Sequence, residues 1–227
     1  MKVTVIAGAS GESAFGDGVR QFCEILRESD CEIKEWYAPF GINGFCERCM
    51  TCVREGEGKC RYSREFMPLW KSMTGADMIV FFTPVYEKGL PAAMKNLFEH
   101  LHFANMEHRP NERMFGMKAL ILQAGESKTA AADISSSAAA WGISAVKTFF
   151  VSPIPAESEL RIAAKKACAM LVKKALPSFS TRIAFAACRK RVSGYGDCSD
   201  KKYWTEKGWL GDTVPWKNSD FRTDEKE

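Results

Sequence analysis

The chain contains one stretch, "ADMIVFFTPVYEKGLPAAMKNLFEH" from Ala76 to His100, that combines the signals of a buried strand, a short loop and a helix. Its opening "ADMIVFFTP" is the most strongly apolar strand signal in the sequence, as expected for a strand covered on both faces. Pro91 stands at the first turn of the following helix, where a missing N–H costs nothing. Met94, Leu97 and Leu101 then recur at helical spacing. The stretch therefore predicts a strand–loop–helix unit.

The same alternation of short apolar runs and helical periods extends through the chain. Strands are expected over residues 3–8, 31–38, 76–84, 116–125 and 145–153, with helices between them and a last helix over 157–176. Strict alternation predicts an α/β fold, a doubly wound parallel sheet with helices on both faces. Five strands suggest the flavodoxin-like order 2-1-3-4-5. Ligands of such sheets bind beyond the carboxyl ends of the strands, where the first and third strands meet.

The pattern weakens after Pro177, which predicts two parts. Residues 1–176 are expected to form the flavodoxin-like domain, and residues 177–227 a C-terminal extension that packs on the domain or on a partner subunit. Within the extension, "FSTRIAFAACRKR" predicts one more helix. The rest is rich in aromatic and turn residues, and its tryptophans are expected to cover a core or an interface.

Composition limits the function classes. At 227 residues and 25.4 kDa, with 46% hydrophobic and 26% charged residues, the chain has the composition of a folded globular protein. The formal charge of +4 is mild and its basic residues are scattered, so nucleic-acid binding is not expected. No apolar run is long enough to cross a bilayer. Nine cysteines, an odd number, predict a reducing compartment, the cytoplasm, rather than a disulfide framework.

The loop after the first strand, "GASGESAFGDG" over residues 8–18, has the composition of an anion-binding loop. Glycines and serines before a helix leave backbone N–H groups free to point at a phosphate. Ser10 and Ser13 are the expected hydroxyl donors, and Asp17 is the expected N-cap of the helix. A plain turn would use the same residues, so the loop alone is a weak signal.

The loop after the third strand carries a more specific pattern. Thr83, Pro84, Val85, Tyr86, Gly89, Pro91 and Lys95 match an S-P-x-Y…G…P…K segment. The segment resembles that of the NAD(P)H-dependent FMN reductase family, within the flavodoxin-like superfold. The resemblance implies that this loop wraps the flavin, with backbone amides and the aromatic residue beside the ring. A rigid aromatic and a close backbone suit a flat heterocycle.

The resemblance extends over roughly residues 1 to 175 as an ordered series of strands and loops. The turn after the fourth strand, "QAGE", matches in position a turn that touches the flavin in relatives. The cofactor-binding residues implied for FMN are Ser10, Ser13, Thr83, Pro84, Val85, Tyr86, Gly89, Gln123, Ala124, Gly125 and Glu126. No catalytic residue is assigned, because the chemistry belongs to the flavin.

The first loop departs from the family pattern. Relatives commonly have G-S-P-R followed by two residues and G-N-S/T, whereas Ala9, Ser10 and Gly11 replace the S-P-R here. Glu12 and Asp17 also bring negative charge near the expected phosphate position. That charge is unfavourable unless the two side chains face solvent or cap the helix.

Four cysteines form a compact C-x2-C-x2-C-x7-C series: Cys46, Cys49, Cys52 and Cys60. The spacing resembles the cluster motif of the iron–sulfur flavoproteins, a branch of the same family that carries a [4Fe–4S] cluster beside FMN. The resemblance implies that these four thiols are metal ligands. Zinc more often uses two C-x2-C pairs far apart, and free thiols as small hydrophobic residues are a third interpretation. Because the loop follows the second strand, it is expected at the same carboxyl edge as the flavin loops.

These features predict an FMN-dependent oxidoreductase that moves electrons from NAD(P)H to an acceptor. One alternative is an iron–sulfur flavoprotein electron carrier, with FMN and a [4Fe–4S] cluster, reduced by a ferredoxin-like partner. A second alternative is a flavin-free regulatory binding module, which the irregular first loop motivates. The family resemblance also leads us to expect a homodimer or a tetramer.

Overall fold

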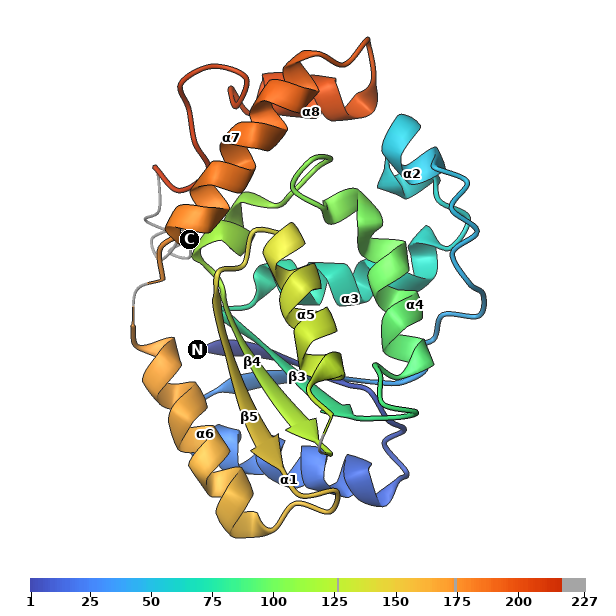
Figure 1. The fold of residues 1–227 in the computed structure, drawn as a ribbon. Coiled ribbons are helices and arrows are strands. Elements are labelled where there is room, and N and C mark those ends of the chain that lie inside the picture. Colours follow the sequence, from blue (N-terminus) through green and yellow to red (C-terminus); the bar gives the residue numbers. More distant parts are fainter. Residues whose placement is uncertain (126, 174, 218–227) are drawn as a thin grey trace, which may run out of the picture.

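A single five-stranded parallel sheet forms the centre of the protein (Figure 1). The computed structural model describes residues 1–125, 127–173 and 175–217. In sheet order, the strands are β2 (Glu32–Tyr37), β1 (Lys2–Ala7), β3 (Met78–Pro84), β4 (Lys118–Ala124) and β5 (Ala145–Val151). The order 2-1-3-4-5 confirms the predicted flavodoxin-like fold.

The sheet is covered on both faces, and the buried residues of β3 show how. Met78, Val80 and Phe82 belong to one apolar cluster with α1 (Ala14–Arg27) and α6 (Glu157–Leu171). Ile79 and Phe81 belong to the other cluster, with three further helices of the domain. These are α3 (Ser63–Gly75), α4 (Ala92–His100) and α5 (Thr129–Ala140). Alternate side chains of a strand point to opposite faces, so a strand buried on both sides must be apolar at every position.

Short elements connect the layers. The segment after β2 contains α2 (Thr51–Arg54) and the 3₁₀ helix η1 (Glu57–Lys59). The segment after α4 contains two more 3₁₀ helices, η2 (Leu101–Ala104) and η3 (Glu112–Gly116). None of the residues in α2 or η1 is buried. These two short helices therefore contribute no buried residue to the core, unlike Phe40 and Ile42 earlier in the same segment.

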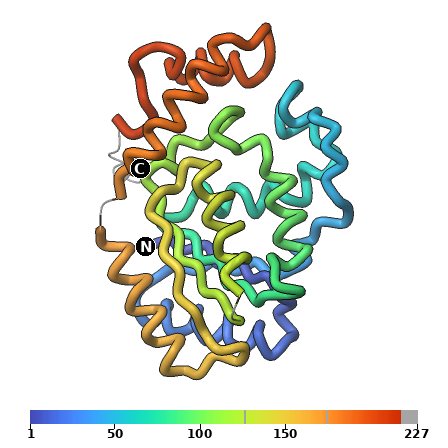
Figure 2. The backbone as a smooth tube through the Cα atoms, viewed as in Figure 1, coloured from blue at the N-terminus to red at the C-terminus, as the bar shows by residue number. Residues whose placement is uncertain are grey.

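The C-terminal extension forms α7 (Phe179–Ser193), as predicted, and α8 (Ser199–Glu206), which the sequence did not predict. It closes a third apolar cluster, in which Phe185, Trp204 and Trp209 pack against Phe115 and Met106 of the domain. Trp204 and Trp209 are almost fully buried, so they cover a core. The backbone trace shows the extension at the same end of the molecule as α2 (Figure 2).

The end of one predicted helix and the N-cap of another differ from the structure. The helix expected over 157–176 ends at Leu171. The helix after the first loop is capped by Ser13, whose side chain accepts a hydrogen bond from the Gly16 N–H, and Asp17 lies in its first turn. In the described part of the chain, every helix is too short or too polar to span a bilayer.

Candidate functional site

The loops after β1, β3 and β4 meet at the carboxyl edge of the sheet. β1 pairs with β2 on one side and β3 on the other, so the chain changes direction of winding at β1. Gly8 at the end of β1 donates its N–H to the Phe82 carbonyl at 2.9 Å, and Val85 after β3 donates to the Ala124 carbonyl at 3.1 Å. The three loops predicted to bind FMN are therefore neighbours.

The first loop presents free backbone donors at the start of α1. Among the described residues, no acceptor faces the backbone N–H of Ser10, Gly11, Ala14 or Phe15. The Ser13 hydroxyl, by contrast, is fully used, because it donates to the Ser10 carbonyl at 2.6 Å and accepts from Gly16. Backbone amides at a helix N-terminus are a favourable environment for an anion. Ser13 thus shapes the loop, and the amides are its free donors.

Gly16 holds this loop against the helix. A Cβ atom on Gly16 would lie 2.4 Å from the Ser10 oxygen and 2.7 Å from the Gly11 oxygen. Contacts that short do not occur between real Cβ atoms and backbone, so only glycine permits this approach. The cradle of free amides depends on the absence of a side chain here.

The acidic residues near this loop are less unfavourable for an anion than the sequence suggested. Arg20 lies one turn into α1, donating one N–H to the Gly11 carbonyl and another to the Asp17 carboxylate. The Asp17 charge is therefore paired, and Glu12 is exposed to solvent. Sequence reasoning missed Arg20; the i, i+3 spacing from Asp17 was the available signal.

The loop after β3 is a tight two-residue hairpin. Tyr86 and Gly89 exchange hydrogen bonds of 3.1 and 2.8 Å, and Glu87 and Lys88 between them adopt left-handed φ angles of 46° and 63°. Such turns favour glycine or asparagine, so contacts from elsewhere must stabilise this one. Ser127 and Thr129 supply them: both hydroxyls donate to the Lys88 carbonyl.

Tyr86 is 55% exposed at the carboxyl edge, although it is aromatic. The hairpin around it is fixed by backbone bonds, so the ring is presented to solvent by a rigid turn. An exposed aromatic on a rigid turn is a suitable platform for a flat ligand.

The other predicted flavin residues occupy different positions at this edge. Thr83 and Gln123 are fully buried, and their polar atoms bind the chain itself. The Gln123 amide donates to the Gly125 and Ser127 carbonyls and accepts from the Ala131 N–H, which fixes the turn after β4. Pro84 and Ala124 are buried at the strand ends, Val85 and Gly89 are half-buried, and Gly125 has a left-handed φ of 108°. Glu126 lies outside the described residues.

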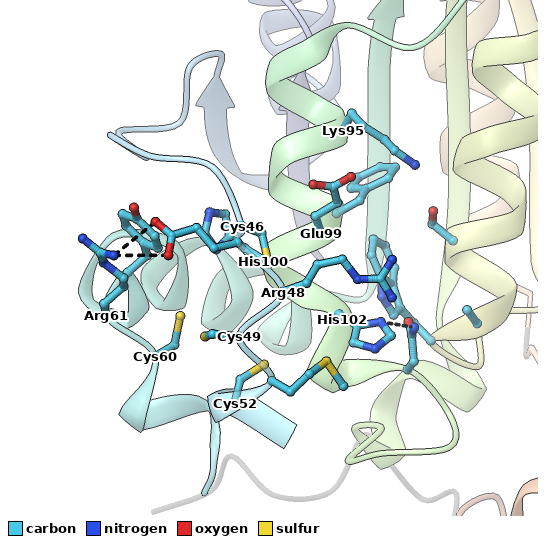
Figure 3. A pocket seen from close by; sticks show the side chains of 18 of the residues that line it. Cys46, Arg48, Cys49, Cys52, Cys60, Arg61, Lys95, Glu99, His100 and His102 are labelled. Carbon is cyan, nitrogen blue, oxygen red and sulfur yellow. Dashed lines mark hydrogen bonds and ion pairs between the residues drawn. The ribbon is translucent and has the colours of Figure 1, made fainter. Parts of the chain in front are cut away.

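The four cysteines of the compact series line one cavity of about 290 Å³. Its other walls come from α4 and the start of η2, from α5, and from Tyr62 (Figure 3). Arg48 and Lys95 extend into it, and neither forms an ion pair with any residue that the structure describes. The cavity wall is aromatic at Phe98 and Trp141.

The thiols of this cavity differ in acidity. Burial raises the pKa of Cys52, and the neighbouring thiols of Cys60 and Cys46 raise it further, while Arg109 opposes the shift. Burial also raises the pKa of Cys60. A hydrogen bond with the side chain of Thr51 lowers the pKa of Cys49. Cys52 and Cys60 are therefore protonated at neutral pH unless a cation displaces their protons.

The donor set suits a thiolate-ligated centre, because four thiols line one cavity, although the carboxylates of Glu47 and Glu99 line it too. Within residues 1–125, 127–173 and 175–217, however, no three His, Cys, Asp or Glu side chains are arranged to hold a metal ion. The assignment of these four residues as metal ligands therefore stays a prediction.

The predicted position of these thiols at the carboxyl edge is wrong. The segment leaves β2 at that edge but runs back along α4, so that the cysteines lie near His100 and His102, at the carboxyl-terminal end of the helix (Figure 3). α4 runs antiparallel to the strands, so its carboxyl-terminal end lies away from the flavin loops (Figure 1). The path of the segment after β2, which is tied to α4 through Asn96 and has no local pattern of its own, explains the error.

Two of the three histidines, His100 and His102, line the cavity, and the third, His108, lies behind His102. His100 is 3% exposed, with its Nε2 on the Gly44 carbonyl at 3.2 Å and its Nδ1 without a partner among the described residues. Asn96 donates to the same carbonyl and accepts from the Cys46 N–H. His102 contacts His108 through the two Nε2 atoms at 3.3 Å, and burial lowers the pKa of His102.

The fold and the arrangement of these loops define a flavodoxin-like protein with backbone amides left unpaired by the described residues, and with an exposed aromatic, at the switch point of the sheet. The family model for NADPH-dependent FMN reductase matches residues 1–154. The chain belongs to this family.

Individual relatives are distant. An iron–sulfur flavoprotein of Methanocaldococcus jannaschii is 24% identical over 99 residues, which are 44% of this chain and 50% of that protein. The chain thus spans about half the length of this curated relative. An FMN-dependent NADH-azoreductase from Bacillus anthracis, solved with FMN, has a TM-score of 0.54 at 13% identity. The match covers 76% of this chain and 99% of the azoreductase chain. An NADH:FMN oxidoreductase, solved in its apo form, has a TM-score of 0.53 at 17% identity, and the match covers 80% of this chain and 93% of that chain. These structural likenesses show the fold.

Proposed function

We propose that the protein moves electrons from NAD(P)H to an acceptor through FMN held at the carboxyl edge of the sheet. The main observation behind the proposal is that two features lie at the same edge of the sheet. These are the free backbone amides before α1 and the exposed Tyr86 on its rigid hairpin. The amides suit the phosphate of FMN, and the tyrosine suits its ring. The family membership supports the same cofactor.

The residues of the chain have distinct roles in this proposal. The N–H groups of Ser10, Gly11, Ala14 and Phe15 bind the phosphate, and Ser13 fixes the loop that presents them. The hairpin at Tyr86 and the turn at Gly125, tied to each other through Ser127, orient the ring. When bound, FMN supplies the chemistry of hydride acceptance from the nicotinamide and electron delivery to the acceptor.

The test is titration of the full-length chain with FMN, followed by oxidation assays with NADH and with NADPH, using ferricyanide as acceptor. We expect quenching of flavin fluorescence on binding and turnover with at least one nicotinamide. Rapid reduction by a ferredoxin-like protein, without turnover of either nicotinamide, would reject the NAD(P)H reductase and favour the electron carrier. Protein that stays colourless with excess FMN would favour the flavin-free regulatory module.

A second candidate function has its own supporting observation. The four thiols of the compact series share one cavity, and the Methanocaldococcus jannaschii relative is named an iron–sulfur flavoprotein. We propose as the alternative an iron–sulfur flavoprotein in which Cys46, Cys49, Cys52 and Cys60 would hold a [4Fe–4S] cluster, which would supply single-electron transfer alongside FMN. A ferredoxin-like partner is then the donor.

Iron and sulfide analysis of anaerobically purified protein tests the cluster. We expect about four irons and four sulfides per chain, and their loss when the four cysteines are replaced by serine. Cys198→Ser is the matched control, because Cys198 is half-buried and lies outside the cavity. Flavin absorption without iron would remove the cluster and leave the reductase.

Two further parts of the proposal concern the assembly and its location. The family resemblance favours a homodimer or tetramer, which a molar mass from light scattering tests directly. Free cysteines throughout the described chain suit a reducing compartment, and we propose the cytoplasm.

A further inference from the structure

The buried side chain of Arg109 connects the cysteine segment with the C-terminal extension. Its guanidinium donates to the Cys52 carbonyl, to the Val53 carbonyl at 3.2 Å and to the Glu57 carboxylate at 3.0 Å. A fourth bond goes to the Asp200 carboxylate of α8. A guanidinium has five N–H groups, so most of its donors are used, three of them on the segment from Cys52 to Glu57.

Asp200 holds Arg109 in this position. The carboxylate is 1% exposed and accepts from two consecutive residues, the Arg109 guanidinium and the Nδ1–H of His108 at 2.7 Å. The helix that carries Asp200 is itself fastened to this region, because the Trp204 indole donates to the His108 carbonyl at 2.6 Å and the Tyr203 hydroxyl to the Pro110 carbonyl at 2.7 Å. The buried charges are therefore paired and fixed.

The cysteine segment needs such external support. A helix of four residues does not form stably by itself, and neither α2 nor η1 buries a residue. Met50 at the start of α2 has a left-handed φ of 60°, a conformation that costs energy for a residue with a side chain. Besides Arg109, the Ser199 hydroxyl of the extension supports the segment by donating to the Arg54 carbonyl at 2.8 Å.

We propose that Arg109 is a positioning residue that keeps the third thiol of the series, Cys52, turned into the cavity, and that Asp200 makes the C-terminal extension a structural part of the cysteine site. The extension thus does more than cover apolar surface. The inference goes beyond the proposed function, because it holds whether the thiols bind a cluster or remain free.

The test is site-resolved alkylation of the reduced, metal-free, full-length chain with iodoacetamide, followed by peptide mass spectrometry. In Asp200→Asn we expect the rate at Cys52 to rise at least about tenfold, because loss of the buried charge partner releases the segment locally. Cys23, which is fully buried under the opposite face of the sheet, should stay as protected as in the wild type.

Tyr203→Phe is the matched control, because it removes a bond between the same helix and the domain without touching Arg109. We expect no change at either thiol. Arg109→Lys keeps the positive charge but cannot reach the carbonyls of Cys52 and Val53 together, so it should also raise alkylation of Cys52. This variant carries the test if Asp200→Asn does not fold.

Three outcomes overturn the proposal. Unchanged alkylation of Cys52 in a folded Asp200→Asn or Arg109→Lys variant would show that the segment holds its conformation without this link. Equal increases at Cys52 and Cys23 would show that the link stabilises the whole fold and does not position the thiol. A rise at Cys52 in Tyr203→Phe as large as in Asp200→Asn would likewise remove the special role of Arg109.

Discussion

Replacing Gly16 by alanine sets two opposite effects against each other. Gly16 lies in the first turn of α1, where alanine has the better helix propensity by about 1 kcal/mol. The new Cβ, however, would lie 2.4 Å from the Ser10 oxygen and 2.7 Å from the Gly11 oxygen. Both atoms belong to the backbone, so the loop must withdraw by about 1 Å to reach an ordinary contact distance.

Overpacking of this kind costs about 1–3 kcal/mol, and a backbone clash belongs at the upper end of that range. The net expectation for Gly16→Ala is a loss of about 1–2 kcal/mol in the free energy of unfolding. The same movement displaces the N–H groups of Ser10 and Gly11, so FMN affinity should fall at least about tenfold. Urea unfolding of the FMN-free chain and fluorescence titration with FMN measure the two effects separately.

Gly75→Ala is the control for the propensity effect. Gly75 ends α3, has nothing within 4 Å of an added Cβ, and adopts an ordinary φ. We expect its stability to be unchanged or raised by up to about 1 kcal/mol, with FMN affinity unaltered. The reasoning is refuted if Gly16→Ala is as stable as the wild type and binds FMN with the same affinity.

Three further predictions test other parts of the structure. Trp204→Ala should lower the free energy of unfolding, measured in urea, by about 3–5 kcal/mol, because Trp204 is fully buried and its ring stacks on Phe185 with centroids 4.9 Å apart. A loss below about 1 kcal/mol would contradict this prediction. Tyr86→Ala should change the free energy of unfolding by less than about 0.5 kcal/mol, because the ring is exposed. The same substitution should weaken FMN binding about tenfold in a fluorescence titration, and an affinity equal to that of the wild type would argue against a ring contact. Glu159 accepts hydrogen bonds from the Ala156 and Ser152 N–H groups, and these bonds lower its carboxyl pKa below the ordinary 4.5. The contribution of Glu159 to the free energy of unfolding is therefore present above pH 4.5 and is lost as the pH falls through the folded-state pKa. In thermal unfolding the deficit of Glu159→Gln should therefore shrink on acidification, and a deficit independent of pH would disprove this linkage.

The fold was predictable because it depends on local patterns. The continuous apolar run from Met78 to Phe82 requires cover on both faces, and strict alternation of strands and helices leaves few sheet orders. The meeting of the loops after β1, β3 and β4 at the carboxyl edge was predictable for the same reason, because parallel strands end at the same edge of a sheet. The loop around Tyr86 was predicted through its family motif, whereas its hairpin form and its support by Ser127 and Thr129 were not.

The roles of individual polar side chains were less predictable. Ser13 and Gln123 were expected at the flavin, but in the structure their polar atoms bind the chain itself. A sequence shows which groups can donate or accept hydrogen bonds, and only the fold shows which partners use them first.

By itself, the sequence determined the sheet, its order, the edge where the loops meet and the four thiols within one short segment. These features depend on residues that are close together in the chain or on periodic burial. Only the tertiary structure decided that the thiols lie along α4, away from that edge, and that Arg109 meets Asp200 across 91 positions. Neither residue has a distinctive local pattern, because a buried ion pair is specified by two distant positions that only the folded chain brings together.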